Sequence, residues 1–289
     1  MGARVVGLMA VALLGPVTGA GAGAEGRRDA SAATPFASSR PGEVIVPAAV
    51  GALGARRFLL DTGSTHTAIT GVLAAALGAI PVARTTMRAS GGTIDCAVVA
   101  LPRVAIGKAA ADGLTATVLP PGAAGALGTG VDGVLGQDFL ARFRFTIDYR
   151  RSRIEWHDAA YVPAGARLTL VPSEDRWLVE LTSSAGGDAP YRFVPDSGAD
   201  TLVLYGQALA DRLVTAWRPG PAALGSLTGT RELRAGVVDR LRVGVAAIIR
   251  QPAVVVPERP AGDVDGLLPL HGFDRVFFNA EERYLVVDR

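Results

Sequence analysis

The sequence FLLDTGSTHTAIT occupies residues 58–70 and contains one acidic residue, Asp61, directly after three apolar residues. A short apolar run of this kind is typical of a buried β-strand. Burying a carboxylate at the end of a strand costs free energy unless the carboxylate is paired or hydrogen-bonded. The position of Asp61 therefore indicates that this side chain has a partner or a function.

A second stretch, FVPDSGADTLVLY at residues 193–205, repeats the layout of the first. It has an apolar run, then Asp196, a small hydroxyl residue, a glycine and another apolar run. The two acids are 135 residues apart (196 − 61 = 135). The repeat makes Asp196 the candidate partner of Asp61.

Other landmarks recur at nearly the same offset. VDGVLGQDFL at residues 131–140 is echoed by VDGLLPLHGF at residues 264–273. Gly107 and Gly244 lie in similar surroundings 137 residues apart (244 − 107 = 137). Separated landmarks that share almost one offset predict a tandem duplication of the whole unit.

Short apolar runs bounded by glycine and proline dominate both halves, and their lengths suit strands better than helices. Helical patterns are confined to residues 71–79 and 205–214, with short turns at 137–143 and 271–277. We therefore expect an all-β protein with two tandem lobes, each a small β-barrel.

The first residues differ from the rest. Arg4 precedes an apolar run, and small residues follow Pro16, which is the pattern of a secretory signal peptide. Export to the periplasm or the medium is the expectation, with a retained N-terminal anchor as the alternative. The predicted organisation is a signal peptide over residues 1–24, a flexible lead-in over 25–42, an N-terminal lobe over 43–157, a linker over 158–172 and a C-terminal lobe over 173–289.

Composition excludes several classes of function. The formal net charge is only +2, and the densest arginine patch, residues 142–153, alternates with apolar residues as a hairpin face does, so no nucleic-acid partner is expected. The chain has one cysteine, so no internal disulfide is expected. Its three histidines are dispersed in the sequence, so no metal site is expected either. It has no G-x-S-x-G motif and no P-loop, and the apolar runs after the signal region are too short or too broken to span a membrane. No cofactor is expected.

The repeated motifs resemble those of the aspartic peptidase family, and the small halves are most similar to its retropepsin-like subgroup. Each half has D-[ST]-G-[AS] followed some seventy residues later by an apolar pair. In this chain the motifs are Asp61, Thr62, Gly63 and Ser64 with Val134, Leu135 and Gly136, and Asp196, Ser197, Gly198 and Ala199 with Leu267 and Leu268.

The resemblance implies two acid-protease-like lobes related by a pseudo-twofold axis, with the active site in the cleft between them. Asp61 and Asp196 would be the catalytic pair, because two adjacent carboxyl groups share one proton and so supply both a general base and a general acid. Thr62 and Ser197 would lock the two loops together, and each motif glycine would allow its loop to turn sharply. The substrate would be a peptide or protein, and one chain would suffice as a monomer.

The resemblance also places a flap, a hairpin that covers the substrate, at the glycine-rich tip formed by Ser90, Gly91 and Gly92, although an ordinary β-turn explains the same letters. Residues 225–233 are the corresponding stretch of the second half.

Two prolines in the second half depart from the family pattern. Pro195 stands where the first half has Leu60, and Pro269 stands where it has Gly136. Proline removes a backbone donor and fixes φ, so the alternative to an active enzyme is a degenerate peptide-binding or scaffolding protein.

Among the remaining polar residues, Asp132 and Asp265 are predicted to form turns.

Overall fold

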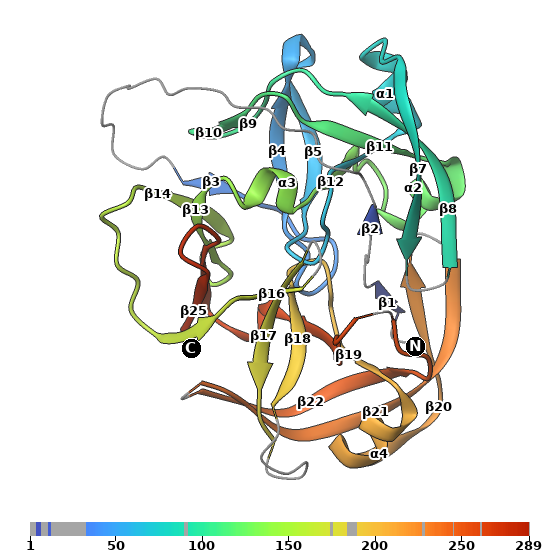
Figure 1. Cartoon of the computed structure of the whole chain (residues 1–289), viewed down its shortest axis with the longest axis vertical. Coiled ribbons are helices and arrows are strands. Elements are labelled where there is room, and N and C mark those ends of the chain that lie inside the picture. Colours follow the sequence, from blue (N-terminus) through green and yellow to red (C-terminus); the bar gives the residue numbers. More distant parts are fainter. Residues whose placement is uncertain are drawn as a thin grey trace.

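The apolar run before Asp61 forms the end of β5 (Ala55–Leu60), where the last three side chains are buried. The structure is a computed structural model that describes residues 4–6, 11–12, 33–89, 92–173, 176–183, 190–226, 229–244, 246–260 and 262–288. Two β lobes lie one above the other in Figure 1, and β5 and its counterpart β18 (Tyr191–Asp196) run toward their junction.

The N-terminal lobe is built around a sheet of ten strands among the described residues. Its own strands are β4 (Ile45–Val50), β5, β6 (Ala68–Thr70), β7 (Pro81–Ala89), β8 (Gly92–Ala100), β9 (Val104–Ile106), β10 (Ala109–Ala111), β11 (Thr115–Leu119) and β12 (Gly133–Leu135). Its helices are η1 (Gly51–Leu53), α1 (Gly71–Ala76), α2 (Pro121–Ala126) and α3 (Gln137–Leu140). The Thr70 side chain caps α1 by accepting a hydrogen bond from the Leu73 N–H at 3.2 Å, which fixes where this helix begins.

The C-terminal lobe has a corresponding sheet, with nine strands in the part of the chain that the structure describes. Its own strands are β16 (Val171–Ser173), β17 (Arg176–Leu181), β18 (Tyr191–Asp196), β19 (Leu202–Tyr205), β20 (Val214–Ser226), β21 (Gly229–Val243), β22 (Ala246–Val256) and β23 (Gly266–Pro269). Its helices are α4 (Gln207–Leu213) and η2 (Leu270–Gly272).

The two lobes share one strand topology, which confirms the predicted duplication and the all-β, two-lobe fold. In the first lobe β12 runs parallel to β5 and antiparallel to β6, and in the second β23 runs parallel to β18 and antiparallel to β19. Asp132 and Asp265 were predicted to form turns, but they lie outside turns and connect neighbouring strands instead. Asp132 accepts a hydrogen bond from the Arg57 N–H at 2.9 Å, and Asp265 accepts one from the Arg192 N–H at 2.8 Å.

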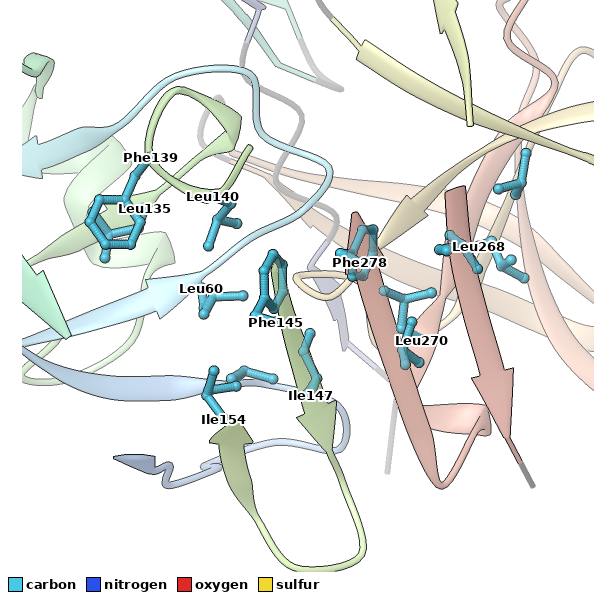
Figure 2. Packing of buried hydrophobic residues seen from close by; sticks show 14 of the residues in the cluster. Leu60, Leu135, Phe139, Leu140, Phe145, Ile147, Ile154, Leu268, Leu270 and Phe278 are labelled. Atoms are coloured by element: carbon cyan, nitrogen blue, oxygen red, sulfur yellow. The ribbon is translucent and has the colours of Figure 1, made fainter. Parts of the chain in front are cut away.

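A third sheet, with six strands among the described residues, joins the lobes. Its strands are β3 (Thr34–Pro35), β13 (Arg144–Asp148), β14 (Arg153–His157), β15 (Ala166–Thr169), β24 (Arg275–Asn279) and β25 (Tyr284–Asp288). The antiparallel pair β13–β24 brings one strand of each lobe together at its centre. Figure 2 shows the core beside this pair, where the Phe145 and Phe278 rings stack with centroids 5.1 Å apart. Side chains from both lobes therefore form one continuous core.

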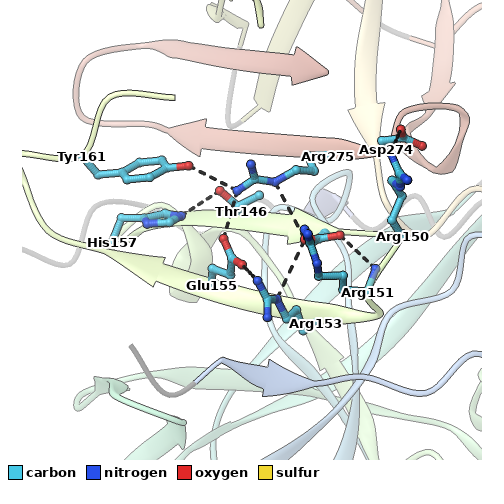
Figure 3. A network of polar contacts seen from close by, with 10 residues as sticks. Thr146, Arg150, Arg151, Arg153, Glu155, His157, Tyr161, Asp274 and Arg275 are labelled. Carbon is cyan, nitrogen blue, oxygen red and sulfur yellow. Dashed lines mark hydrogen bonds and ion pairs between the residues drawn. The ribbon is translucent and has the colours of Figure 1, made fainter. Parts of the chain in front are cut away.

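A polar network on the joining sheet adds a second tie between the lobes (Figure 3). Asp148 of the first lobe is fully buried, and its carboxylate accepts a hydrogen bond from Arg151 at 3.1 Å. Arg275 of the second lobe donates to Glu155 at 3.0 Å and to the Tyr161 hydroxyl at 3.3 Å. A buried carboxylate is stable when cations and backbone donors surround it, so this cluster fixes the orientation of one lobe against the other.

Three expectations about the connecting segments need correction. The lead-in predicted to be flexible over residues 25–42 contributes β3, which pairs with β14, and Phe36 of the core. The predicted linker, residues 158–172, contains β15, which forms the opposite edge of the joining sheet. Residues 271–277 were expected to form one short turn, but β24 begins within them at Arg275. β3 has only two residues, too few to show a strand period, whereas residues 166–169 alternate apolar and polar side chains as a strand does.

The segment predicted to be a signal peptide includes two short described strands. β1 (Arg4–Val6) runs parallel to β20, and β2 (Val11–Ala12) runs antiparallel to β7. Among the helices of the described residues, none combines the length and the apolar character that crossing a membrane requires.

Candidate active site

Asp61 and Asp196 follow equivalent strands and meet at the junction of the lobes. Asp61 comes directly after β5, and Asp196 is the last residue of β18. Their exposed fractions are 0% and 1%, so both carboxyl groups are removed from solvent. The duplication has thus brought together two acids that are 135 residues apart in sequence (196 − 61 = 135).

Each carboxyl group is held by its own loop through one oxygen. Asp61 Oδ1 accepts hydrogen bonds from the N–H groups of Gly63 at 2.9 Å and Ser64 at 3.1 Å. Asp196 Oδ1 accepts them from Gly198 at 2.7 Å and Ala199 at 3.0 Å. Both Oδ2 atoms are buried and receive no hydrogen bond from a backbone or hydroxyl donor of the described residues. These two oxygens are the ones left to interact with each other and with a reactant.

Thr62 and Ser197 connect the two loops, as the resemblance implied. The Thr62 hydroxyl donates to the Pro195 carbonyl at 2.7 Å and accepts from the Ser197 N–H at 3.0 Å. The Ser197 hydroxyl donates to the Leu60 carbonyl at 2.7 Å and accepts from the Thr62 N–H at 3.0 Å. These four buried hydrogen bonds set the separation of the two aspartates.

The motif glycines are required for a different reason from the one expected. Neither Gly63 nor Gly198 has a positive φ, so a sharp turn does not explain them. A Cβ on Gly63 would instead lie 2.6 Å from Cγ of Asp196, and a Cβ on Gly198 would lie 2.9 Å from Cγ of Asp61. Any larger residue would push one loop away from the aspartate of the other lobe.

Burial and mutual charge give the pair unusual acidities. Burial raises the pKa of Asp61 well above its ordinary value, and the charge of Asp196 and a hydrogen bond to that carboxyl raise it further. Burial also raises the pKa of Asp196, to about 6, against the lowering effect of its backbone donors and of Asp61. Burial is the main cause of both shifts, and the hydrogen bond between the two side chains raises the pKa of Asp61 and lowers that of Asp196.

The apolar pairs lie under the loops. Val134 and Leu135 of β12 and Leu267 and Leu268 of β23 are all buried, each pair beside the strand that ends at an aspartate. In the first lobe the Asp61 N–H also donates to the Leu135 carbonyl at 3.0 Å. The predicted motif residues therefore pack beside the strands that carry the two aspartates.

The two prolines leave the loop of the second lobe in register. Pro195 pairs with Leu268 and Asp196 with Pro269 along β18 and β23. The hydrogen bond that Pro195 cannot donate corresponds to the one from the Leu60 N–H to the Val44 carbonyl at 2.8 Å. Its carbonyl still accepts from Thr62, as the Leu60 carbonyl accepts from Ser197.

The predicted flap falls on a hairpin, β7–β8, which begins its return strand at Gly92. Ser90 and Gly91 lie outside the described residues. The second lobe has a longer hairpin, β20–β21, whose tip at residues 227 and 228 also lies outside them. The two hairpins point toward each other on the same side of the molecule in Figure 1.

The three histidines lie apart. His66 follows the first motif and its Nδ1 is 2.9 Å from the Thr65 hydroxyl, whereas His157 belongs to the joining sheet, where its Nε2 is 2.7 Å from the Thr146 hydroxyl. No group of three histidine, cysteine, aspartate or glutamate side chains in the described ranges is arranged to hold a metal ion.

Sequence reasoning missed several residues around the pair. Gln137 donates from Nε2 to the Thr62 carbonyl at 2.7 Å, and its position directly after the apolar pair and Gly136 is a signal that was available. The charge of Asp196 adds to the raised pKa of Tyr149, and the cation of Arg176 lowers the pKa of Asp196. No local pattern marks Tyr149 or Arg176, because only the packing of the lobes brings them near the site.

Comparison with known proteins identifies the family of this chain. A model of the family described as aspartyl protease matches residues 46–139 and again residues 181–270. A solved structure, a retropepsin-like aspartic protease from Rickettsia conorii, is similar at 24% identity over 44% of this chain and 90% of that chain, with a TM-score of 0.31. A search of curated proteins found no significant match. Because the family match covers both repeats and contains both aspartate loops, the chain belongs to the aspartyl protease family.

Proposed function

We propose that the protein is an aspartic endopeptidase, which hydrolyses peptide bonds with a water molecule activated by Asp61 and Asp196. The observation that carries the proposal is the arrangement of the two buried carboxyl groups. Each has one oxygen fixed by two backbone N–H groups and one oxygen that no such donor occupies. Nothing in a purely structural role requires two buried acids to face each other at this cost in free energy.

In the proposed reaction the ionised carboxylate removes a proton from water as the water oxygen attacks the peptide carbonyl carbon. The protonated carboxyl group donates its proton to the carbonyl oxygen, which gives a neutral tetrahedral intermediate. As the C–N bond breaks, the carboxyl group that took the proton from water donates it to the leaving nitrogen, and the other carboxylate removes a proton from one hydroxyl group of the intermediate. The products are a carboxylic acid and an amine, and the pair again holds one proton.

One sheet edge in each lobe supports an extended peptide as the substrate. The edges of β7 and β20 can accept a further strand, since β2 and β1 pair with them. A peptide in extended conformation can bind to such edges through its backbone, which gives affinity with little dependence on sequence. Thr62, Ser197 and the motif glycines would keep the carboxyl groups aligned beneath it.

The alternative is a peptide-binding protein that has lost turnover. The observation in its favour is that both departures from the motif, Pro195 and Pro269, lie in one lobe. Incubation with a mixed peptide library separates the two functions. An endopeptidase produces new termini, and a statine-type transition-state mimic blocks their appearance. Retention of library peptides without any cleavage would favour the binding protein.

We propose further that the protein is exported and acts as a monomer. Export predicts that the mature chain begins between about residues 21 and 30, which N-terminal sequencing of periplasmic or secreted protein determines. A monomer is expected because one chain supplies both aspartates. Light scattering, together with specific activity at several concentrations, tests this, and activity per molecule that rises with concentration would contradict it.

A further inference from the structure

Gln137 connects the start of α3 to the loop that carries Asp61. Its side chain is buried, and its Nε2 donates a hydrogen bond to the Thr62 carbonyl at 2.7 Å. Its backbone N–H donates a second one, to the Ser64 carbonyl at 2.8 Å. One residue therefore binds the loop at two carbonyl groups, one on each side of Gly63.

The carbonyl that accepts the Gln137 amide belongs to the same peptide group as the Gly63 N–H, and the two are coupled by resonance. That N–H donates to Asp61 Oδ1 at 2.9 Å. When the carbonyl of a peptide group accepts a hydrogen bond, the group is polarised and its N–H becomes a stronger donor. The bond from Gln137 therefore reaches the Asp61 carboxylate through one peptide group, and it favours negative charge on that carboxylate.

The titratable groups near the pair act from elsewhere. Asp196 faces Asp61, and the charge of Asp196 is felt by Tyr149, while Arg176 acts on Asp196. None of these three groups belongs to α3. The amide of Gln137 therefore contacts the Asp61 loop independently of them.

The acid of α3 has a different partner. Asp138 accepts hydrogen bonds from the Thr67 N–H at 2.9 Å and from the Thr67 hydroxyl at 2.8 Å. The charge of His66 also acts on Asp138. Since Asp138 binds Thr67, α3 presents a neutral amide to the Thr62 carbonyl.

The second lobe has no amide at the corresponding position. The repeated stretches VDGVLGQ and VDGLLPL end at Gln137 in the first lobe and at Leu270 in the second. Leu270 is buried, and its hydrocarbon side chain cannot donate a hydrogen bond. The Gly198 N–H still binds Asp196 Oδ1 at 2.7 Å, but its peptide group receives no amide from this position. At this position the two carboxyl groups are therefore supported unequally.

We propose that Gln137 is a positioning residue that fixes the Thr62 carbonyl and, through the peptide group of Thr62 and Gly63, favours ionisation of the catalytic pair. The effect on catalysis rests on the proposed function, whereas the hydrogen bond does not. Without the amide, the buried carbonyl would lose this partner and the negative charge of the pair would be less stable. The first ionisation of the pair would then require a higher pH.

The first test is kinetic and uses Gln137→Met, because methionine has the length of glutamine but no donor. We expect kcat to fall by about tenfold while KM changes by less than about threefold, since the variant removes a bond to the loop and none to the substrate. The acid limb of kcat/KM should also move to higher pH, by about 0.3–0.5 pH units. Gln137→Leu, which copies the residue of the second lobe, should move the limb in the same direction if methionine disturbs folding.

Gln207→Met is the matched control. The Gln207 amide donates to Asp211 at the same distance, 2.7 Å, but it lies in α4 of the second lobe. This variant should keep both kcat and the acid limb of the wild type. An acid limb that stays in place in Gln137→Met and Gln137→Leu, or equal changes in Gln137→Met and Gln207→Met, would overturn the proposal.

The second test does not depend on turnover. In isotopically labelled protein, the backbone amide resonance of Gly63 should move to lower chemical shift in Gln137→Met, because its peptide group becomes less polarised. The Gly198 amide should move far less, whereas a general displacement of the interlocked loops would move both. The carboxyl ¹³C resonances of labelled aspartate follow the first ionisation of the pair, which should occur at higher pH in the variant.

Two results of this second test would contradict the proposal: a Gly63 resonance that stays in place, or equal movement of the Gly63 and Gly198 resonances. If the wild-type protein cleaved no peptide, the proposed function would fail, while these resonances would still decide the role of Gln137.

Discussion

Gly63 of the first lobe and Asp196 of the second are in such close contact that a Cβ on the glycine would lie 2.6 Å from the aspartate Cγ. The reciprocal contact, between Gly198 and Asp61, is almost as close at 2.9 Å. Each lobe therefore shapes the position of the carboxyl group that the other lobe supplies. The separation of the pair is a property of the interface between the lobes, and substitutions at these contacts should disturb activity more than folding.

Gly63→Ala should separate the two aspartates. The added methyl group overlaps the carboxyl group of Asp196, and relief of such an overlap in a packed site costs about 1–3 kcal/mol of stability. Displacement of the pair should lower kcat/KM by about a hundredfold or more, because catalysis depends on alignment to within a fraction of an ångström. Thermal unfolding and peptide turnover measure the two effects. Gly71→Ala is the control, since an added Cβ there meets no atom within 4 Å; comparable losses in both variants would contradict the steric account.

Thr62→Val should weaken the junction between the loops. Valine has nearly the shape of threonine but cannot donate to the Pro195 carbonyl or accept from the Ser197 N–H. Two buried backbone groups would lose their partner, at a cost of about 1–3 kcal/mol each. Thr62→Ser keeps the hydroxyl and should remain within about 1 kcal/mol of the wild type. Chemical denaturation of the three proteins makes the comparison, and equal stability of the valine and serine variants would show that the hydroxyl contributes nothing.

The raised acidities predict how stability depends on pH. A carboxyl group whose pKa is higher in the folded state contributes most below its unfolded pKa, and that contribution is lost as the pH rises through the folded pKa. For Asp196 the window runs from its ordinary value of 3.8 to about 6, and that shift corresponds to about 3 kcal/mol. Asn at both positions removes the titration but keeps an oxygen for the backbone N–H groups. The stability of Asp61→Asn/Asp196→Asn relative to the wild type should therefore increase between pH 4 and pH 7, and a difference that does not vary with pH would contradict the shifts.

The same acidities predict the acid limb of the activity profile. Below the first ionisation of the pair both carboxyl groups are protonated and no general base remains. The fall in kcat/KM on the acid side should therefore lie near pH 6, above the range of an ordinary aspartate. Turnover measured from pH 3 to pH 8 tests this, and a limb near pH 4 would show that the pair is less strongly perturbed.

The duplication made the fold and the aspartate pair predictable from sequence. Two copies of a strand, an acid, a hydroxyl residue and a glycine identify both loops, and a repeated Asp-Gly pair marks the strand beside each. The roles of Asp132 and Asp265 were not predicted, because each accepts a hydrogen bond from a backbone N–H more than seventy residues away and neither forms the expected turn.

The features that the sequence did not predict depend on contacts between the lobes. β3 is too short to show a strand period and depends on its pairing with β14, whereas the apolar–polar alternation of residues 166–169 was an available signal for β15. The motif glycines looked like turn residues, since the aspartate that requires them is in the other lobe.

The central claim is that Asp61 and Asp196 form one catalytic unit, and peptide turnover of the wild type, Asp61→Asn, Asp196→Asn and the double variant tests it most directly. Two carboxyl groups that share a proton cannot act singly, so each single variant should lose turnover by several orders of magnitude, and the double variant should be hardly worse than either. All four proteins should remain folded, since asparagine preserves the acceptor for the backbone N–H groups of each loop. An Asp196→Asn variant that cleaves peptides at close to the wild-type rate would contradict the account, because the second lobe would then supply no part of the catalytic site.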